Sequence, residues 1–360
     1  MPPVSQSTYY QRLRAELVAE PRTWLVTGVA GFVGSSLLQD LLVLGQTVIG
    51  LDNFSTGYQA NLDEVLGEEV VGTFRLIEGD IRDLDACRSA CDGVDYVLHH
   101  AALASVPRSI DDPVTNTQVN VDGFLNVLVA ARDANVQRVV YASSSAVYGD
   151  ATDIPQVEDR VGRVLSPYAA AKKTNELYAD VFQRTYGLQS VGLRYFNVFG
   201  RRQDPDGAYA AVIPRWVSNL LNGEPCDIYG DGETSRDFIY VANAVQANLL
   251  AATADKDVSG EVYNIACGQE TSLNELFRMI RLGLTGYQPS VADQEAAYDD
   301  FRTGDIRRSV ANISKARRRL GYEPLVSVPE GLGEALEWYA TRARTDNGVG
   351  ASVVDRGMSP

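Results

Sequence analysis

The sequence predicts an α/β fold: a doubly wound parallel sheet flanked by helices, followed by a smaller α/β lobe toward the C-terminal end. Two observations predict it. From residue 24 to about residue 200, short apolar segments alternate with longer segments of helical periodicity. Beyond Gly200 the chain changes to short pieces interrupted by proline and glycine. At 360 residues the chain is long enough to bury a core in each part.

The expected elements follow in order. Residues 9–20 form an amphipathic helix that ends before Pro21. The apolar segment 24–27 is the first strand, and the helix after the next turn continues through Leu44. Further strands are expected at 47–51, 74–78, 96–98, 138–142, 191–195, 238–241 and 262–265, with helices between the earlier ones, the longest over 114–135.

These elements divide the chain into four regions. Residues 1–22 are an N-terminal helical extension, and residues 23–200 form the first domain. Residues 201–344 mainly form the second lobe, with 237–266 returning to the first domain because its apolar segments are typical of buried strands. Residues 345–360 are polar and contain glycine, and we expect a frayed, disordered tail there.

Composition excludes several classes of function. Lys+Arg 32 against Asp+Glu 47 gives a formal net charge of -15, so neither a nucleic-acid backbone nor an anionic membrane surface is an expected partner. The sequence shows no cleavable signal and no apolar run of about 18 residues, so we expect a cytoplasmic protein without a membrane anchor. The four cysteines lack the spacing of a metal site, and His99 and His100 are the only histidines, so no metal is expected.

A glycine-rich turn, Gly28-Val29-Ala30-Gly31-Phe32-Val33-Gly34, joins the first strand to its helix. Glycines here allow a tight turn, let backbone N–H groups reach a pyrophosphate and let the helix pack closely. Asp52 ends the second strand roughly 20 residues further on, where a carboxylate binds the adenosine ribose and repels a 2′-phosphate. The sequence therefore predicts a Rossmann-like domain that binds NAD rather than NADP. A turn that serves only packing, with Asp52 as a cap, is the alternative.

Residues after the following strands complete the expected cofactor site. Asp80 and Ile81 bracket the adenine, and the small residues Ala101 to Ala104 let the backbone pass close to the cofactor, although a packing role also fits the alanines. Apart from the residues introduced below, the expected cofactor-binding set is Gly28, Gly31, Phe32, Val33, Gly34, Asp52, Asn53, Phe54, Ser55, Thr56, Gly57, Asp80, Ile81, Ala101, Ala102, Ala104 and Asn120.

Tyr168 and Lys172 lie in the alanine-rich stretch Ser166-Pro167-Tyr168-Ala169-Ala170-Ala171-Lys172. Alanine favours helix, and a spacing of four places both side chains on one face, about 5–6 Å apart at Cβ. The unperturbed pKa of tyrosine is near 10, and we expect the ammonium to lower it so that the phenol acts as a general acid or base beside the dinucleotide. The alternative is a tyrosine and a lysine on the surface of an ordinary helix.

Further motifs carry a family resemblance. They are Ser143-Ser144-Ser145-Ala146-Val147-Tyr148-Gly149, Leu193-Arg194-Tyr195-Phe196-Asn197-Val198-Phe199-Gly200, Gly200-Arg201-Arg202-Gln203-Asp204-Pro205 and Asp231-Gly232-Glu233-Thr234-Ser235-Arg236-Asp237-Phe238. With the motifs above and over about residues 22–340, the chain resembles the extended short-chain dehydrogenases/reductases that act on nucleotide sugars. Within them it most resembles the bacterial UDP-N-acetylglucosamine 4-epimerases.

The resemblance implies a catalytic set of Ser144, Ser145, Tyr168 and Lys172, with Ser144 bonded to the sugar 4-oxygen and Tyr168 as the base. It implies that Lys172 binds the nicotinamide ribose and that Tyr195 borders the nicotinamide. Arg236 and Arg302 would clamp the diphosphate. The implied substrate-binding set is Ala104, Ser105, Ser144, Ser145, Asn197, Gln203, Ala211, Val212, Trp216, Tyr229, Arg236, Arg302, Asp305 and Ser309. Trp216 and Tyr229 would contact the uridine. The alternative is that the two arginines lie on the surface and that the two aromatic residues only pack within the lobe.

The implied reaction is the reversible, NAD-dependent inversion of a UDP-hexose at C4 through a 4-keto sugar, most of all UDP-GlcNAc and UDP-GalNAc. Ala146-Val147 stand where related dehydratases and decarboxylases carry an acidic residue, which disfavours those reactions. A UDP-uronic acid 4-epimerase, a catalytically silent NAD-binding scaffold and a net dehydrogenase are the alternatives. The resemblance also implies a homodimer through the helices near 114–135 and 168–186.

Two positions refine these expectations. By resemblance Ser309 forms a wall of the sugar pocket with Ala104 and Ala211, and three small residues suggest room for an acetamido group; a capping or solvent-facing serine is the alternative. Ala242 stands where relatives usually have aspartate, and Asn243 is expected to cap the helix instead.

Overall fold

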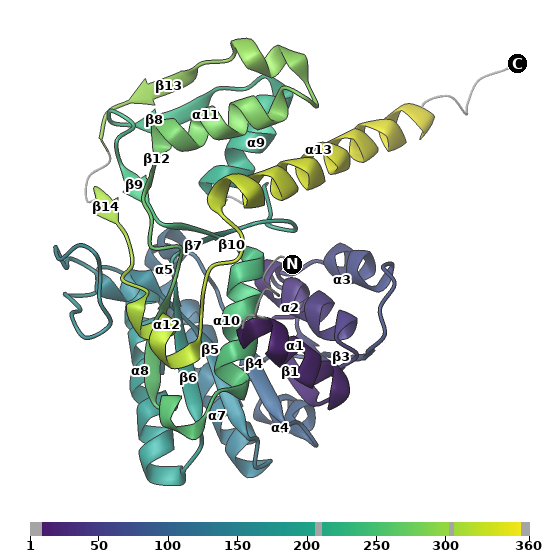
Figure 1. Cartoon of the computed structure of the whole chain (residues 1–360), viewed down its shortest axis with the longest axis vertical. Coiled ribbons are helices and arrows are strands. Elements are labelled where there is room, and N and C mark those ends of the chain that lie inside the picture. Colours follow the sequence, from purple (N-terminus) through teal and green to yellow (C-terminus); the bar gives the residue numbers. More distant parts are fainter. Residues whose placement is uncertain (1–8, 206–210, 302–305, 354–360) are drawn as a thin grey trace, which may run out of the picture.

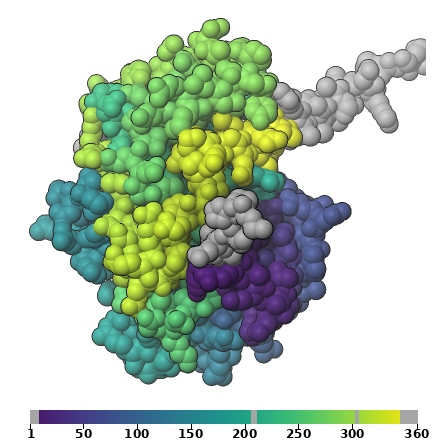
Figure 2. All heavy atoms as spheres, viewed as in Figure 1, coloured from purple at the N-terminus to yellow at the C-terminus, as the bar shows by residue number. Residues whose placement is uncertain are grey.

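The computed structural model describes residues 9–205, 211–301 and 306–353, which form two lobes stacked along the long axis of the molecule (Figure 1). The larger lobe holds the parallel sheet and the N-terminal helix. The C-terminal part of the chain, yellow in Figure 2, runs over the junction between the lobes beside the purple N-terminal helix.

The main sheet has seven parallel strands in the order β11-β6-β5-β4-β1-β2-β3. The chain leaves β1 to build one half of the sheet and returns beside it to build the other, so a crevice opens at the carboxyl ends of β1 and β4. The central strands are buried on both faces, which explains their continuous apolar sequences. The strands are β1 (Thr23–Thr27), β2 (Thr47–Asp52), β3 (Thr73–Glu78), β4 (Tyr96–His99), β5 (Arg138–Ser144), β6 (Ser190–Tyr195) and β11 (Glu261–Ile265).

Helices cover both faces of this sheet, as the alternating pattern predicts. Helices α2 and α10 pack on one face with α1 and α3 beside them, and α4, α7 and α8 pack on the other. Their bounds are α1 (Tyr9–Ala19), α2 (Phe32–Val43), α3 (Gln59–Leu66), α4 (Leu84–Cys91), α7 (Gly123–Asp133), α8 (Pro167–Tyr186) and α10 (Val241–Thr253). Shorter helices are α5 (Val106–Asp111), α6 (Pro113–Thr117), the 3₁₀ turns η2 (Ser145–Tyr148) and η3 (Lys256–Val258), and α12 (Ser314–Leu320).

The smaller lobe has its own core, built from three helices and short strands. Its helices are α9 (Val212–Asn222), α11 (Leu273–Leu284), the 3₁₀ turn η4 (Pro289–Asp293) and α13 (Val328–Val353). Its strand pairs and triplet are made of β7 (Asn197–Phe199), β8 (Cys226–Tyr229), β9 (Ser235–Arg236), β10 (Phe238–Tyr240), β12 (Thr271–Ser272), β13 (Ala296–Asp299) and β14 (Arg308–Ser309).

Three details differ from the sequence-based expectations. The helix expected over 114–135 is interrupted by a π-helical turn, η1 (Gln118–Asp122). Strand β10 is buried but pairs with β7 outside the main sheet, so the stretch 237–266 rejoins the first lobe at α10 and β11. Helix α13 continues past residue 345 to Val353. The glycines in this stretch weaken a helix but, unlike proline, do not prevent one.

Candidate functional site

A cavity of about 330 Å³ opens at the carboxyl edge of the main sheet and is called the first cavity here. It is lined by residues that lie far apart in the sequence, and many of them are residues that the sequence predicts to bind the cofactor. Its lining is Gly28, Gly31, Phe32, Val33, Gly34, Leu51, Asp52, Asn53, Ser55, Thr56, Gly57, Gly79, Asp80, Ile81, His100, Ala101, Ala102, Leu103, Ala104, Val119, Ala142, Ser143, Ser144, Tyr168, Lys172, Tyr195 and Phe196.

The glycine turn forms one end of the first cavity. Gly28 has φ +70°, and a Cβ there would lie 2.7 Å from the backbone nitrogen of Ala101. A Cβ on Gly34 would collide with the carbonyl oxygen of Gly28. Helix α2 begins directly after Gly31 without a side-chain cap, so its first N–H groups are available to an anion. This geometry requires glycine and fits a pyrophosphate.

Two carboxylates lie beside that turn. Asp52 fixes the loop, since one oxygen accepts from the Ala30 N–H and the other from the Phe54 N–H, each at 2.8 Å. Each oxygen keeps a further lone pair for a ribose hydroxyl. The Arg82 side chain holds the pKa of Asp80 down at about 2, so this group is also an anion at neutral pH. Negative charge at this end disfavours a 2′-phosphate, which supports NAD over NADP.

Tyr168, Lys172 and Ser144 meet at the other end of the first cavity. Ser166 caps α8 by accepting from the Ala169 N–H, and this places Tyr168 in the first turn. The Lys172 ammonium donates to the Ala142 carbonyl oxygen at 2.9 Å and lies 5.9 Å from the Tyr168 ring centroid. Ser144 ends β5 and hydrogen-bonds the Tyr168 side chain. The three side chains therefore form one group of proton donors and acceptors.

The expected effect of Lys172 on Tyr168 is wrong for the chain by itself. Burial raises the pKa of Tyr168, and the hydrogen bond with Ser144 only partly opposes the rise. The ammonium is directed to the Ala142 carbonyl over the face of the ring, and burial lowers its own pKa to about 8. Desolvation therefore decides the direction of the pKa shift of both groups in the chain by itself.

A buried ion pair lies behind this group, and sequence reasoning assigned it no role. The Arg194 guanidinium donates through Nε and Nη2 to the two Glu176 oxygens, at 2.7 and 2.8 Å. Ser143 donates to the same carboxylate at 2.7 Å. Glu176 is one turn beyond Lys172 on α8, and Ser143 precedes Ser144 on β5. The pair therefore fixes α8 against the strand end that carries Ser144.

His100 is a second residue that sequence reasoning missed. Asn248 donates to the Tyr195 hydroxyl at 2.6 Å, and that hydroxyl lies 3.0 Å from His100 Nε2. Burial lowers the pKa of His100 to about 3, so the ring is neutral and shares a hydrogen bond with the Tyr195 hydroxyl through Nε2. Its position directly after β4, beside the predicted Ala101, was the available signal.

A second cavity, of about 260 Å³, collects half of the expected substrate-binding residues. Phe196 lines the first cavity and the next residue, Asn197, lines the second, so the two cavities adjoin. The Trp216 indole N–H is buried and finds no hydrogen-bond partner among the described residues, so it is available to a ligand. The expected residues found here are Asn197, Gln203, Ala211, Val212, Trp216, Tyr229 and Arg236.

Other predicted residues lie beside the cavities and do not line them. Asn120 bonds both the N–H and the carbonyl of Leu103, and so holds the loop that lines the first cavity. Ser105 caps α5, Phe54 donates its N–H to Asp52, and Ser145 begins η2. Arg302 and Asp305 lie outside the described residues.

Ser309 is not among the residues that line either cavity, so its role as a pocket wall stays a prediction. It lies in β14 opposite Arg236 of β9, and its hydroxyl is 3.4 Å from Gln156 Oε1. It is 8% exposed, so the alternative of a solvent-facing serine is wrong. Asn243 does not cap α10; its side chain bonds the backbone of Leu325 and Val326.

Residues 24–266 match the model of the NAD dependent epimerase/dehydratase family. The chain belongs to this family. Its cofactor is NAD, in agreement with the glycine turn and Asp52. Within the described residues no cluster of side chains could hold a metal ion, and no helix is long and apolar enough to cross a membrane.

Several members of the family are similar to this chain over most of its length. A UDP-N-acetylglucosamine 4-epimerase structure from Methanobrevibacter ruminantium, in complex with UDP-N-acetylmuramic acid, is 40% identical with a TM-score of 0.81, covering 89% of this chain and 99% of that one. A UDP-glucose 4-epimerase of Mycolicibacterium smegmatis is 36% identical over 89% of this chain and 99% of its own. UDP-glucuronate 4-epimerase 4 of Arabidopsis thaliana is 34% identical over 88% of this chain and 75% of its own.

Proposed function

We propose that this NAD-dependent enzyme interconverts the C4 epimers of a UDP-hexose, with UDP-GlcNAc and UDP-GalNAc as its substrates. The observation that carries the proposal is the meeting of Tyr168, Lys172 and Ser144 at the end of the first cavity, next to a second cavity that ends in Arg236 and Trp216. The similar 4-epimerases named above support the reaction class. They differ in the sugar that their names give, so the sugar is argued from this chain.

Each side chain has a defined task in this reaction. NAD, when bound, accepts a hydride from C4 and returns it to the other face of the sugar. The ionised Tyr168 phenolate accepts the proton of the 4-hydroxyl and gives it back, while the Ser144 hydroxyl orients that oxygen. The Lys172 ammonium bonds the nicotinamide ribose and favours the ionised phenol once a ribose hydroxyl shares its site. Because the proton and the hydride both return, the net redox change is zero.

Residues of the second cavity bind the nucleotide in this assignment. Arg236 is the cation that faces the diphosphate, and a guanidinium offers it a planar pair of donors. The Trp216 indole and the Tyr229 ring provide an aromatic wall and a donor for the base. A nucleotide held in this way lets the sugar turn about its diphosphate link.

Small residues support an N-acetylated sugar. Ala104 lines the first cavity and Ala211 the second, and such small side chains leave room for an acetamido group. The cations that line the second cavity are Arg215 and Arg236, and our assignment places the diphosphate on Arg236. The UDP-uronic acids are the second candidate, because Arg215 is a further cation that would meet their C6 carboxylate.

One experiment separates these functions. Purified protein is incubated separately with UDP-GlcNAc, UDP-glucose and UDP-glucuronic acid, and the products are resolved by chromatography while NADH is followed by absorbance. We expect UDP-GalNAc to form without added NAD and without free NADH, because bound cofactor is recycled. UDP-galacturonic acid as the main product would assign the uronic substrate. In a parallel incubation with excess NAD, NADH in proportion to substrate would indicate a dehydrogenase, and no product from any sugar would indicate a silent scaffold.

A further inference from the structure

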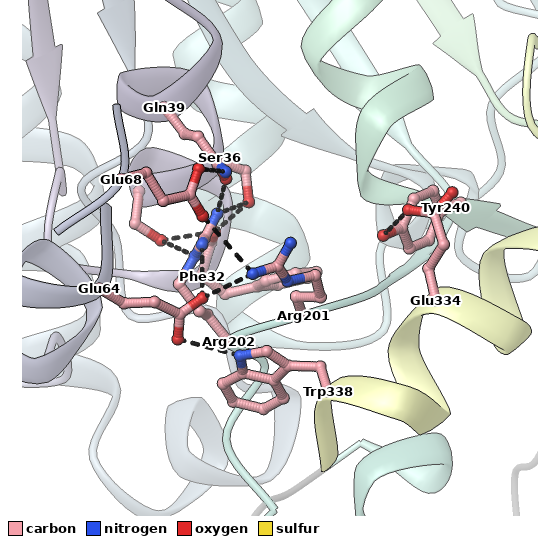
Figure 3. A network of polar contacts seen from close by, with 11 residues as sticks. Phe32, Ser36, Gln39, Glu64, Glu68, Arg201, Arg202, Tyr240, Glu334 and Trp338 are labelled. Atoms are coloured by element: carbon pink, nitrogen blue, oxygen red, sulfur yellow. Dashed lines mark hydrogen bonds and ion pairs between the residues drawn. The ribbon is translucent and has the colours of Figure 1, made fainter. Parts of the chain in front are cut away.

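Arg202 has an unusual backbone and an extensively bonded side chain. Its φ is +66°, a left-handed conformation that is unfavourable for a residue with a Cβ. Such a conformation persists only where the surroundings determine it. The side chain is 2% exposed and donates to the Ser35 hydroxyl of α2 at 3.1 Å. It also donates to Oε1 of Gln39, on the same helix, at 2.7 Å (Figure 3).

Glu64 of α3 gathers the donors that meet Arg202. Its Oε1 accepts from Arg202 Nη1 at 2.9 Å and from Arg201 Nη2 at 3.1 Å. Its Oε2 accepts from the Trp338 indole N–H of α13 at 2.9 Å (Figure 3). One carboxylate thus joins the cofactor lobe, the chain that crosses to the smaller lobe and the C-terminal helix.

Residues 200–204, called the crossing segment here, connect these contacts to the second cavity. The segment follows β7, which lines that cavity with Asn197, and it contains Gln203, which lines it too. The Tyr339 hydroxyl donates to the Gln203 carbonyl oxygen at 2.6 Å. Tyr58, one residue after Gly57 of the first cavity, donates to Asp204 at 2.6 Å. The crossing segment therefore links the loop of one cavity to the wall of the other.

We propose that Arg202 and Glu64 are positioning residues that set the wall of the second cavity against the cofactor lobe. The inference rests on the proposed function of that cavity as the nucleotide-sugar site. Neither residue of the pair lines the first or second cavity, and the Arg202 side chain bonds the helices α2 and α3 that follow the cofactor loops. Loss of the pair should therefore weaken the binding of a uridine nucleotide while leaving the glycine turn able to hold NAD.

The test uses full-length, NAD-containing protein and three substitutions. Arg202→Gly removes the side chain but suits the backbone, Arg202→Lys keeps the charge without the planar fork, and Glu64→Gln keeps the shape and one acceptor. UDP affinity is measured by calorimetry, and KM and kcat with UDP-GlcNAc. We expect Arg202→Gly and Glu64→Gln to weaken UDP binding and raise KM by about tenfold, the effect of losing charged hydrogen bonds, with a smaller change in kcat. Arg202→Lys should recover part of the loss.

Glu68→Gln is the matched control, because Glu68 lies 3.7 Å from Arg201 and bonds Gln39 but does not bond Arg202 or Trp338. It should bind UDP as the parent does. Parent-like UDP binding in Arg202→Gly and Glu64→Gln would overturn the positioning role, as would a loss of NAD content with UDP affinity unchanged. A parent protein that binds no UDP would instead overturn the proposed function of the cavity, and the role assigned to the pair with it.

Discussion

The burial of Lys172 lowers the stability of the fold and places a charged group at the proposed reaction site. Its ammonium is buried with one carbonyl partner, and burial lowers its pKa to about 8. A charge held in this way costs folding free energy, and a functional role is the usual reason to retain it. Tyr168 lies in the same environment, where burial raises its pKa. Proton transfer at neutral pH therefore depends on ligands that change the surroundings of both groups.

Tyr168→Phe tests the base directly. The substitution removes one oxygen and no packing volume, so the fold and the bound NAD should be unchanged. We expect kcat with UDP-GlcNAc to fall about 10²–10⁴-fold, the typical contribution of a general acid or base. Steady-state kinetics and NAD release on denaturation provide the two measurements. A loss below about tenfold would reassign the base, most plausibly to Ser144.

Lys172→Met tests the cost of the buried ammonium through pH. A lysine whose pKa falls to about 8 on folding destabilises the native state below pH 8, and the penalty disappears as pH rises toward the unfolded value near 10.4. At pH 7, nucleotide-free Lys172→Met should therefore unfold at a higher urea concentration than the parent. Its free energy of unfolding should exceed that of the parent by at most about 3 kcal/mol. The difference should shrink between pH 8 and 10. A constant difference over that range would mean that packing, and not charge, separates the two proteins.

Residue types were predictable where one backbone geometry demands them, and less so where tertiary packing decides. The glycine turn, Asp52 and the Tyr168–Lys172 spacing follow from local rules, and all of them line one cavity. The surroundings of Ser309 depend on which residues a short strand places beside it, and β14 pairs it with Arg236, which lines the second cavity while Ser309 does not. Asn120 is a similar case, since its contact with Leu103 joins the π-helical turn η1 to the loop after β4.

At the scale of elements, apolar periodicity predicted the strands of the sheet and their alternation with helices. It could not predict η1, because apolar periodicity carries no information about tertiary contacts. The π-helical turn contains Asn120, which hydrogen-bonds the Leu103 backbone. It also could not place β10. Alternate residues of that strand face different lobes, with Ile239 in the core of the first and Phe238 and Tyr240 in the core of the second.

The docking of α8 on the sheet can be tested at Arg194. Arg194→Met removes the cation that meets Glu176, leaving a buried carboxylate with only Lys173 and Ser143 as partners. We expect unfolding free energy to fall by about 3–5 kcal/mol at pH 7, with loss of activity because α8 carries Tyr168. Despite burial, Arg194 lowers the pKa of Glu176, so the deficit should shrink in acid as that carboxyl becomes neutral. Urea unfolding from pH 4 to pH 8 measures this. An equal deficit at every pH would assign the loss to packing.

At the scale of the whole molecule, the outer face of α8 and its neighbours remains to be accounted for. Leu177 and Val181 lie one turn apart on α8 and are 58% and 47% exposed. Ile110 and Val114, on the short helices that pack beside α8, are 60% and 65% exposed. Apolar side chains gathered on neighbouring helices indicate an interaction surface, and the family resemblance favours a second copy of this chain as its partner.

Leu177→Glu tests this homodimer, because in a twofold interface one substitution places two like charges against apolar surface. Sedimentation or light scattering should give the parent twice the chain mass of 39.2 kDa and the variant a single chain mass. Val71→Glu is the matched control, since Val71 is 82% exposed, outside α8 and its neighbours, and should leave the dimer intact. Helix α8 is also held from inside by Glu176 and Arg194, so monomeric Leu177→Glu should keep its NAD and most of its kcat. A monomeric parent, or a variant that dimerises as the parent does, would show that this face has another role.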